Sequence, residues 1–222
     1  MKCFPSSRAA RLRLLALVVV LAVISYVFHV QSALYLLSYH PREGDILFQS
    51  LPHDPLVDAI EGVTHSPYSH CGVVIKSGDH WVVIESIFDV HETPLLRWLT
   101  RGRSGGFAAY RLDSRFEKAI PNFKKELLAY TGYPYDFDYS LSDQAIYCSE
   151  LPYKAFKKAT GEELGKIEAL GDLDWKPYNG FIKSVQGKVP LEREMITPVS
   201  LAKAHQLKEV FRKGIDGPAL NP

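Results

Sequence analysis

The stretch that most constrains the fold is residues 68–87, which read YSHCGVVIKSGDHWVVIESI. Two runs rich in β-branched residues are joined by SGDH, a pattern typical of two strands and a tight turn. Gly78 and Asp79 suit a two-residue turn because both residue types are favoured in the turns that close hairpins. The sequence therefore predicts an antiparallel hairpin in which Ser77 faces His80.

This register predicts that an imidazole and a carboxylate are neighbours. Gly72 would face Glu85, and His70 and Glu85 would be diagonal neighbours on one face, with Cα atoms ~7–8 Å apart. A slip of one residue would move Glu85 to the other face. Cys71 follows His70 and is expected to point to the opposite face, as a core residue and not as a partner of Cys148. For the same reason these side chains are not expected to bind a metal.

A second constraint is the proline in residues 146–156, IYCSELPYKAF. Pro152 can occupy only the first turn of a helix, so the helix cannot begin much before Ser149. Cys148 is therefore expected at or just outside the helix N-terminus. The helix dipole there lowers the pKa of a thiol, and the free N–H groups can receive a developing oxyanion.

A thiol, an imidazole and a carboxylate together predict covalent catalysis. Taken singly, Cys148 could be a buried small hydrophobe, His70 an ordinary sheet histidine and Glu85 an exposed strand residue. Taken together, they match a nucleophile, a base and a group that orients the base. We assign Cys148, His70 and Glu85 to these roles in that order.

The N-terminal 40 residues are expected to form a separate segment. Residues 14–30 carry no charge, and basic residues precede them: Lys2, Arg8, Arg11 and Arg13. This pattern is typical of a transmembrane or signal helix, and an uncleaved anchor fits it better than a removable signal peptide. The expected organisation is an anchor or signal over 1–40 and one domain over 41–222.

The rest of the chain predicts an α+β domain with a small antiparallel sheet packed with helices. Further strands are expected at 46–50 and 106–112. Helices are expected after Asp54, from Phe116, from Ser149 to Gly161 and from Thr197 to Gly214. With 26 Lys and Arg against 25 Asp and Glu, the net charge of +1 gives no reason to expect a nucleic-acid partner. Three cysteines do not make a disulfide framework.

Six segments, in this order along the chain, resemble those of the YiiX/YebB-like cysteine hydrolases. They are GDILF (44–48), YSHCGVV (68–74), VIES (83–86), TPLLRW (93–98), YPYDFDY (133–139) and IYCSEL (146–151). These hydrolases are circularly permuted papain-like proteins of the NlpC superfamily, with lecithin retinol acyltransferase as a more distant relative. Cys71 and Pro152 stand where the family pattern leads us to expect aliphatic residues.

The resemblance implies a papain-like (NlpC-type) fold and a catalytic Cys148, His70 and Glu85. Tyr135 and Ser149 are candidates to line the oxyanion or substrate site. The expected activity is cleavage of amide bonds, on cell-envelope peptides, through an acyl-enzyme. The alternatives are an acyltransferase or lipid hydrolase and a catalytically silent binding domain.

No cofactor or metal is expected, and the expected partners are a peptide or acyl substrate and, through the N-terminal helix, a membrane. The expected location is the bacterial inner membrane with the domain in the periplasm, or the periplasm alone if the segment is cleaved.

Overall fold

The structure is a computed structural model that describes residues 8–216; Lys2 and Cys3 lie outside the described residues. The chain divides into two compact units, Met1–His40 and Pro41–Pro222. The described part of the first unit is mainly one helix, α1 (Arg8–Ser38). A bilayer requires about 20 consecutive apolar residues. Among the described residues no helix combines the length and the apolarity that crossing a membrane requires, so the predicted membrane-spanning helix is not supported.

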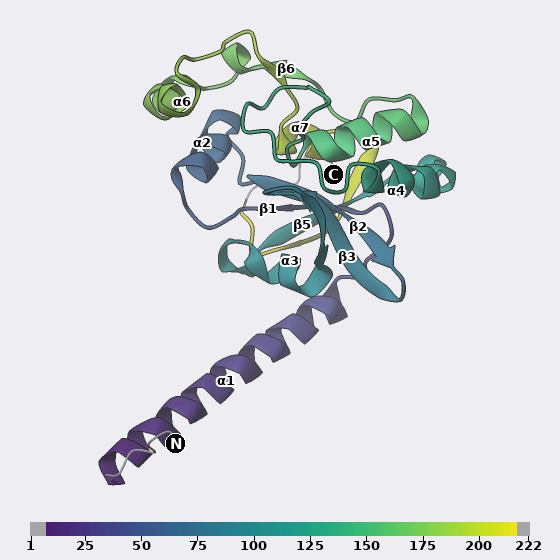
Figure 1. Cartoon of the computed structure of the whole chain (residues 1–222). Helices are drawn as coiled ribbons and strands as arrows, with labels where there is room; N and C mark the ends of the chain where they lie inside the picture. Colours follow the sequence, from purple (N-terminus) through teal and green to yellow (C-terminus); the bar gives the residue numbers. More distant parts are fainter. Residues whose placement is uncertain (1–7, 217–222) are drawn as a thin grey trace. The chain divides into compact units, whose positions relative to one another are not determined.

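The second unit is built on a six-stranded antiparallel sheet with the strand order β4-β3-β2-β1-β5-β8 (Figure 1). The strands are β1 (Ile46–Gln49), β2 (His70–Ser77), β3 (His80–Ser86), β4 (Val90–Pro94), β5 (Phe107–Leu112) and β8 (Leu207–Lys213). Two short strands, β6 (Glu168–Ala169) and β7 (Glu194–Met195), pair with each other. The α+β class with an antiparallel sheet is therefore confirmed.

Helices pack on both faces of the sheet. They are α2 (Pro55–Thr64), α3 (Leu95–Arg101), α4 (Ile120–Leu128), α5 (Glu150–Thr160), α6 (Asn179–Gln186) and α7 (Pro198–Ala202). Short 3₁₀ turns are η1 (Arg103–Gly105), η2 (Ser114–Ala119), η3 (Leu170–Asp172) and η4 (Lys176–Tyr178). Figure 1 shows α3 on the side of the sheet opposite to α4 and α5. The main hydrophobic core joins the sheet to α4 and α5 through Phe123, Leu127 and Phe156.

The β2–β3 hairpin has the predicted register. Ser77 pairs with His80 and Val73 pairs with Ile84. Gly78 has a φ of 57°, a left-handed conformation that glycine adopts without steric cost. Because this turn is short, it fixes which side chains of β2 and β3 share a face.

The predicted N-terminal boundaries of α2 and α5 are confirmed. The Asp54 side chain accepts hydrogen bonds from the N–H groups of Leu56 and Val57 at the start of α2. Ser149 is the N-cap residue of α5, and Pro152 lies in the first turn, where a missing N–H is tolerated.

The predicted helix from Thr197 to Gly214 is wrong over most of its length. Thr197 caps α7, but this helix ends at Ala202, and β8 follows and pairs with β5. The edge of β5 supplies backbone hydrogen-bond partners, and Phe211 stacks on Phe107 with ring centroids 5.0 Å apart. Sheet pairing and this contact outweigh the local helical pattern.

Candidate active site

His70 and Glu85 are in direct contact in the interior of the second unit. His70 Nε2 lies 2.5 Å from Glu85 Oε2, and the two residues are only 2% and 0% exposed. A Cβ atom built on Gly72 would lie 3.2 Å from the Glu85 Cβ, as expected if Gly72 faces Glu85 across the hairpin. The predicted pair is therefore present in the structure.

Three further residues, which sequence reasoning missed, hold the Glu85 carboxylate. Thr93 Oγ1 donates to Oε1 at 2.6 Å, Trp98 Nε1 donates to Oε2 at 3.0 Å, and Arg101 Nη1 donates to Oε1 at 3.0 Å. Thr93 and Trp98 belong to the TPLLRW segment, so the resemblance had marked their neighbourhood. Arg101 had no short-range signal, because it meets Glu85 only after α3 folds back on the sheet.

Cys148 lies directly before the N-cap of α5 and is 3% exposed. The His70 ring and the Cys71 side chain lie near enough to it to lower the pKa of its thiol. The Cys71 thiol also donates to the Cys148 carbonyl oxygen at 3.4 Å. Cys148 therefore lies in the neighbourhood of His70, which in turn contacts Glu85.

Cys71 is a core residue that forms no disulfide with Cys148, as predicted, although its thiol contacts the Cys148 carbonyl. Adjacent strand residues point to opposite faces in the middle of a sheet. His70, the first residue of β2, accordingly contacts Glu85, while Cys71 contacts the backbone of Cys148. Cys71 is also fully buried, as expected, and both thiols are free.

The charges of this cluster favour a thiolate and an imidazolium. The Cys71 thiol and the His70 ring hold the pKa of Cys148 well below its usual value, although burial opposes this shift. Burial alone would lower the pKa of His70, but hydrogen bonds with Cys148 and Glu85 raise it to about 9. Burial would likewise raise the pKa of Glu85, but His70 and Arg101 hold it well below the usual range. Each charge is therefore compensated by a neighbour of opposite sign.

The two predicted lining residues occupy different positions. Ser149 lines a small cavity beside Cys148, and its hydroxyl donates to the Ile196 carbonyl at 2.8 Å. Tyr135 is half-buried, and its hydroxyl lies 3.4 Å from that of Tyr139. Tyr139 itself lines the cavity at Cys148.

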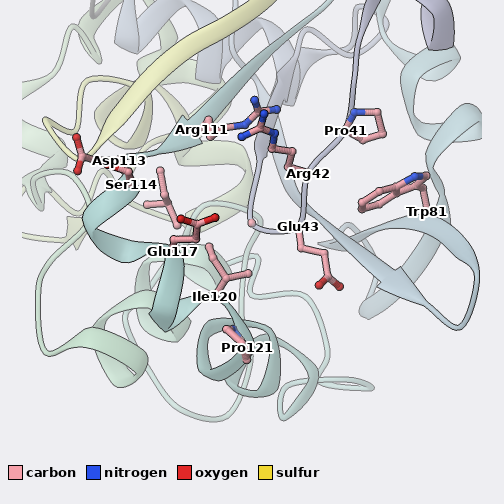
Figure 2. Close-up of a pocket in the computed structure, with 12 residues that line it drawn as sticks. Pro41, Arg42, Glu43, Trp81, Arg111, Asp113, Ser114, Glu117, Ile120 and Pro121 are labelled. Carbon is pink, nitrogen blue, oxygen red and sulfur yellow. The ribbon is translucent and has the colours of Figure 1, made fainter.

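A larger cleft lies elsewhere in the second unit, and none of Cys148, His70 and Glu85 lines it. It measures about 610 Å³ and is lined by Arg42, Glu43, Trp81, Arg111 and Glu117 among others (Figure 2). Arg111 donates to Asp45 at 2.7 Å, which ties the strand β5 to the turn before β1. We therefore place the candidate site at Cys148 and not at this larger cleft.

A solved structure similar to this chain is the metalloprotein YiiX from Escherichia coli O157:H7. It is 31% identical, with a TM-score of 0.74, and the match covers 79% of this chain and 99% of that one. In residues 8–216 no group of three or more His, Cys, Asp and Glu side chains is arranged to hold a metal ion. The chemistry proposed below uses the side chains alone.

Sequence comparisons agree with the structural match. The chain is 30% identical over 180 residues to the uncharacterized protein YiiX of Escherichia coli strain K12, covering 79% of this chain and 89% of that protein. Residues 40–211 match the family described as permuted papain-like amidase enzyme, YaeF/YiiX, C92 family. The chain therefore belongs to the YaeF/YiiX (C92) family of permuted papain-like amidases.

Proposed function

We propose that this protein hydrolyses amide bonds through a Cys148 nucleophile, a His70 acid and base, and a Glu85 that orients the imidazole. The observation that carries the proposal is the 2.5 Å contact of His70 with Glu85 beside a buried cysteine at the start of α5. A resting thiolate and imidazolium fit this role, because the nucleophile is already deprotonated and the base already holds the proton that the leaving group needs.

The reaction has two halves. The Cys148 thiolate attacks the amide carbonyl carbon, a C–S bond forms, and the backbone N–H groups at the start of α5 stabilise the oxyanion. The C–N bond then breaks, and His70 gives its proton to the leaving amine. In the second half His70 takes a proton from water, the resulting hydroxide attacks the thioester, and the carboxylic acid leaves Cys148 as a free thiolate.

The substrate source and the location are also part of the proposal. We propose amide-containing material of the cell envelope as the substrate and the periplasm as the location. Fractionation of cells that express the full chain tests the location, and recovery of the protein only with cytoplasmic markers would contradict it.

The nucleophile is tested by comparing the full chain with Cys148→Ala and Cys71→Ala. The proteins are incubated with an iodoacetamide probe at neutral pH and, separately, with peptidoglycan peptides, and the products are identified by mass. Cys148→Ala should lose cleavage and the labelling of residues 41–222, while Cys71→Ala should keep the labelled peptide that contains Cys148. Labelling of the peptide that contains Cys71, at the same rate in Cys148→Ala, would assign the reactive thiol to Cys71 instead.

A further inference from the structure

The two cysteines of the second unit meet in its interior, although they are 77 positions apart in the sequence. The Cys71 thiol donates to the Cys148 carbonyl oxygen at 3.4 Å, and both side chains belong to the main hydrophobic core. Both thiols are free in this structure. The carbonyl group and the side chain of Cys148 are attached to the same Cα atom, so the two sulfur atoms lie in one small region.

The two thiols differ in their protonation. The Cys71 thiol and the His70 ring lower the pKa of Cys148. Burial and the neighbouring Cys148 raise the pKa of Cys71. Oxidants react with the thiolate form of cysteine. Cys148 is therefore the cysteine that oxidises first, and Cys71 is a thiol held beside it.

The two thiols also differ in access. The small cavity at Cys148 measures about 50 Å³, and Cys71 is not among its lining residues. A water molecule needs only about 10–15 Å³ of such volume, so this cavity has room for an oxidant as small as hydrogen peroxide. Cys71 is fully buried. Peroxide therefore meets the Cys148 sulfur, and Cys71 reacts only with the product formed there.

We propose that hydrogen peroxide oxidises Cys148 and that Cys71 then forms a disulfide with it, which inactivates the protein reversibly. The Cys148 thiolate attacks one peroxide oxygen, an S–O bond forms, the O–O bond breaks, and the hydroxide that leaves takes a proton from His70. The Cys71 sulfur then attacks the sulfenic acid sulfur, the S–S bond forms, and the S–O bond breaks. The hydroxide released in this step leaves with the Cys71 proton as water. The two sulfur atoms together lose two electrons, and one peroxide is reduced to two water molecules.

The disulfide has two consequences. It removes the nucleophile, so cleavage stops until a reductant restores the Cys148 thiolate. It also consumes the sulfenic acid before further peroxide converts it to sulfinic acid, which is not reversed by thiols. In an oxidising compartment such a bond persists until a reductant reaches it. The loss of cleavage rests on the proposed function, whereas formation of the disulfide does not.

The test uses the full chain with Cys3→Ser, which leaves Cys71 and Cys148 as its only cysteines. The protein is treated with hydrogen peroxide at neutral pH, free thiols are blocked with N-ethylmaleimide, and peptides are identified by mass without a reductant. Peptides that contain Cys71 and Cys148 should be found linked. Iodoacetamide labelling of Cys148 and cleavage of peptidoglycan peptides should fall together. Dithiothreitol should restore nearly all of both, because a disulfide is reducible.

Two substitutions at Cys71 provide matched controls in the same Cys3→Ser protein. Cys71→Val places an aliphatic side chain of similar size in the buried position, and Cys71→Ser keeps a hydroxyl donor there. Neither variant can form the bond, so Cys148 should proceed to sulfinic acid. Dithiothreitol should then restore less than about a tenth of the lost labelling. Each variant is compared with its own untreated sample, and circular dichroism should show both folded.

A methionine at the same cavity needs its own control. Met195 lines the cavity at Cys148, and peroxide can oxidise its thioether. Methionine sulfoxide needs a dedicated reductase for its repair. Loss of activity that dithiothreitol reverses therefore comes from the cysteines and not from Met195.

The outcomes separate this inference from the proposed function. If the untreated protein cleaves peptides but peroxide produces no linked peptide, the inference is overturned and the proposed function stands. Recovery in Cys71→Val and Cys71→Ser equal to that of the protein with both cysteines also overturns the inference. If the linked peptide forms but the untreated protein cleaves no amide, the disulfide stands and the proposed function fails.

Discussion

Glu85 shows how a buried carboxylate is kept charged. Burial of an ionised group is unfavourable unless partners replace the lost water. Here the His70 ring, an arginine, a tryptophan N–H and a threonine hydroxyl surround the two oxygens. The contacts that orient His70 therefore also stabilise the fold. A substitution of Glu85 must be assessed by both the free energy of unfolding and kcat/KM.

Replacing Glu85 by Gln should damage both stability and activity. Arg101 would lose its charged partner, so the free energy of unfolding should fall by about 3 kcal/mol. His70 would lose its orienting carboxylate, and kcat/KM for any amide substrate should fall at least a hundredfold. The control is Glu92→Gln on β4, an exposed position that should change neither quantity. Urea unfolding and steady-state kinetics test this, and full activity in Glu85→Gln would remove Glu85 from the mechanism.

Cys71 should set the pH at which Cys148 becomes reactive. The rate of alkylation by iodoacetamide rises with pH as the Cys148 thiol loses its proton. The Cys71 thiol helps to hold that pKa low, so Cys71→Ala should move the rise to higher pH. Cys71→Ser keeps a hydroxyl donor and should shift the profile less. Identical profiles in the wild-type protein and Cys71→Ala would show that the Cys71 contact has no electrostatic effect.

At the scale of elements, the end of the sheet is what assembles the site. β2 begins at His70, and α5 begins two residues after Cys148. The N-terminal ends of β2 and α5 therefore contribute to one site. The first N–H groups of a helix have no hydrogen-bond partner within the helix, so those of α5 can bind a ligand. Helix α2 also lines the cavity at Cys148, so its cap affects this cavity as well as the fold.

Removing the cap of α2 should destabilise the protein modestly. The Asp54 carboxylate accepts from the N–H groups of Leu56 at 2.8 Å and Val57 at 2.9 Å. Asp54→Ala leaves both donors without this partner and should lower the free energy of unfolding by about 1 kcal/mol. Asp54→Asn retains an acceptor oxygen and should cost about half as much or less. Chemical denaturation measures both, and an equal loss in the two variants would point to the charge instead of the cap.

At the scale of the whole molecule, Glu150 should make stability depend on pH. Its carboxylate is buried in the first turn of α5, and burial raises its pKa to about 7, although Lys154 at 2.8 Å and the Tyr147 N–H favour the charged form. An acid with a raised folded-state pKa stabilises the fold while protonated, and this contribution is lost as the pH rises through about 7.

The comparison of wild-type protein with Glu150→Gln isolates this effect. Between pH 5 and pH 8 the wild-type protein should lose about 2 kcal/mol more than the variant, because glutamine does not ionise. Thermal or urea unfolding at several pH values measures the difference. Parallel curves for the two proteins would mean that Glu150 ionises at its ordinary pKa.

Local sequence was sufficient for the features that depend on neighbouring residues. The turn at Gly78, the cap at Asp54 and the start of the helix after Cys148 each follow from interactions within a few positions. The pairing of His70 with Glu85 followed as well, because a two-residue turn fixes the register of both strands.

Features that join distant segments had no such local signal. Arg101 meets Glu85 across α3, Cys71 meets Cys148 across 77 positions, and β8 forms because β5 offers an edge to it. The cavity at Cys148 likewise forms only where α2, the start of α5 and residues 195–198 come together. A pattern of neighbouring residues contains no information on which distant surface will be buried against it, so folding alone decided these contacts.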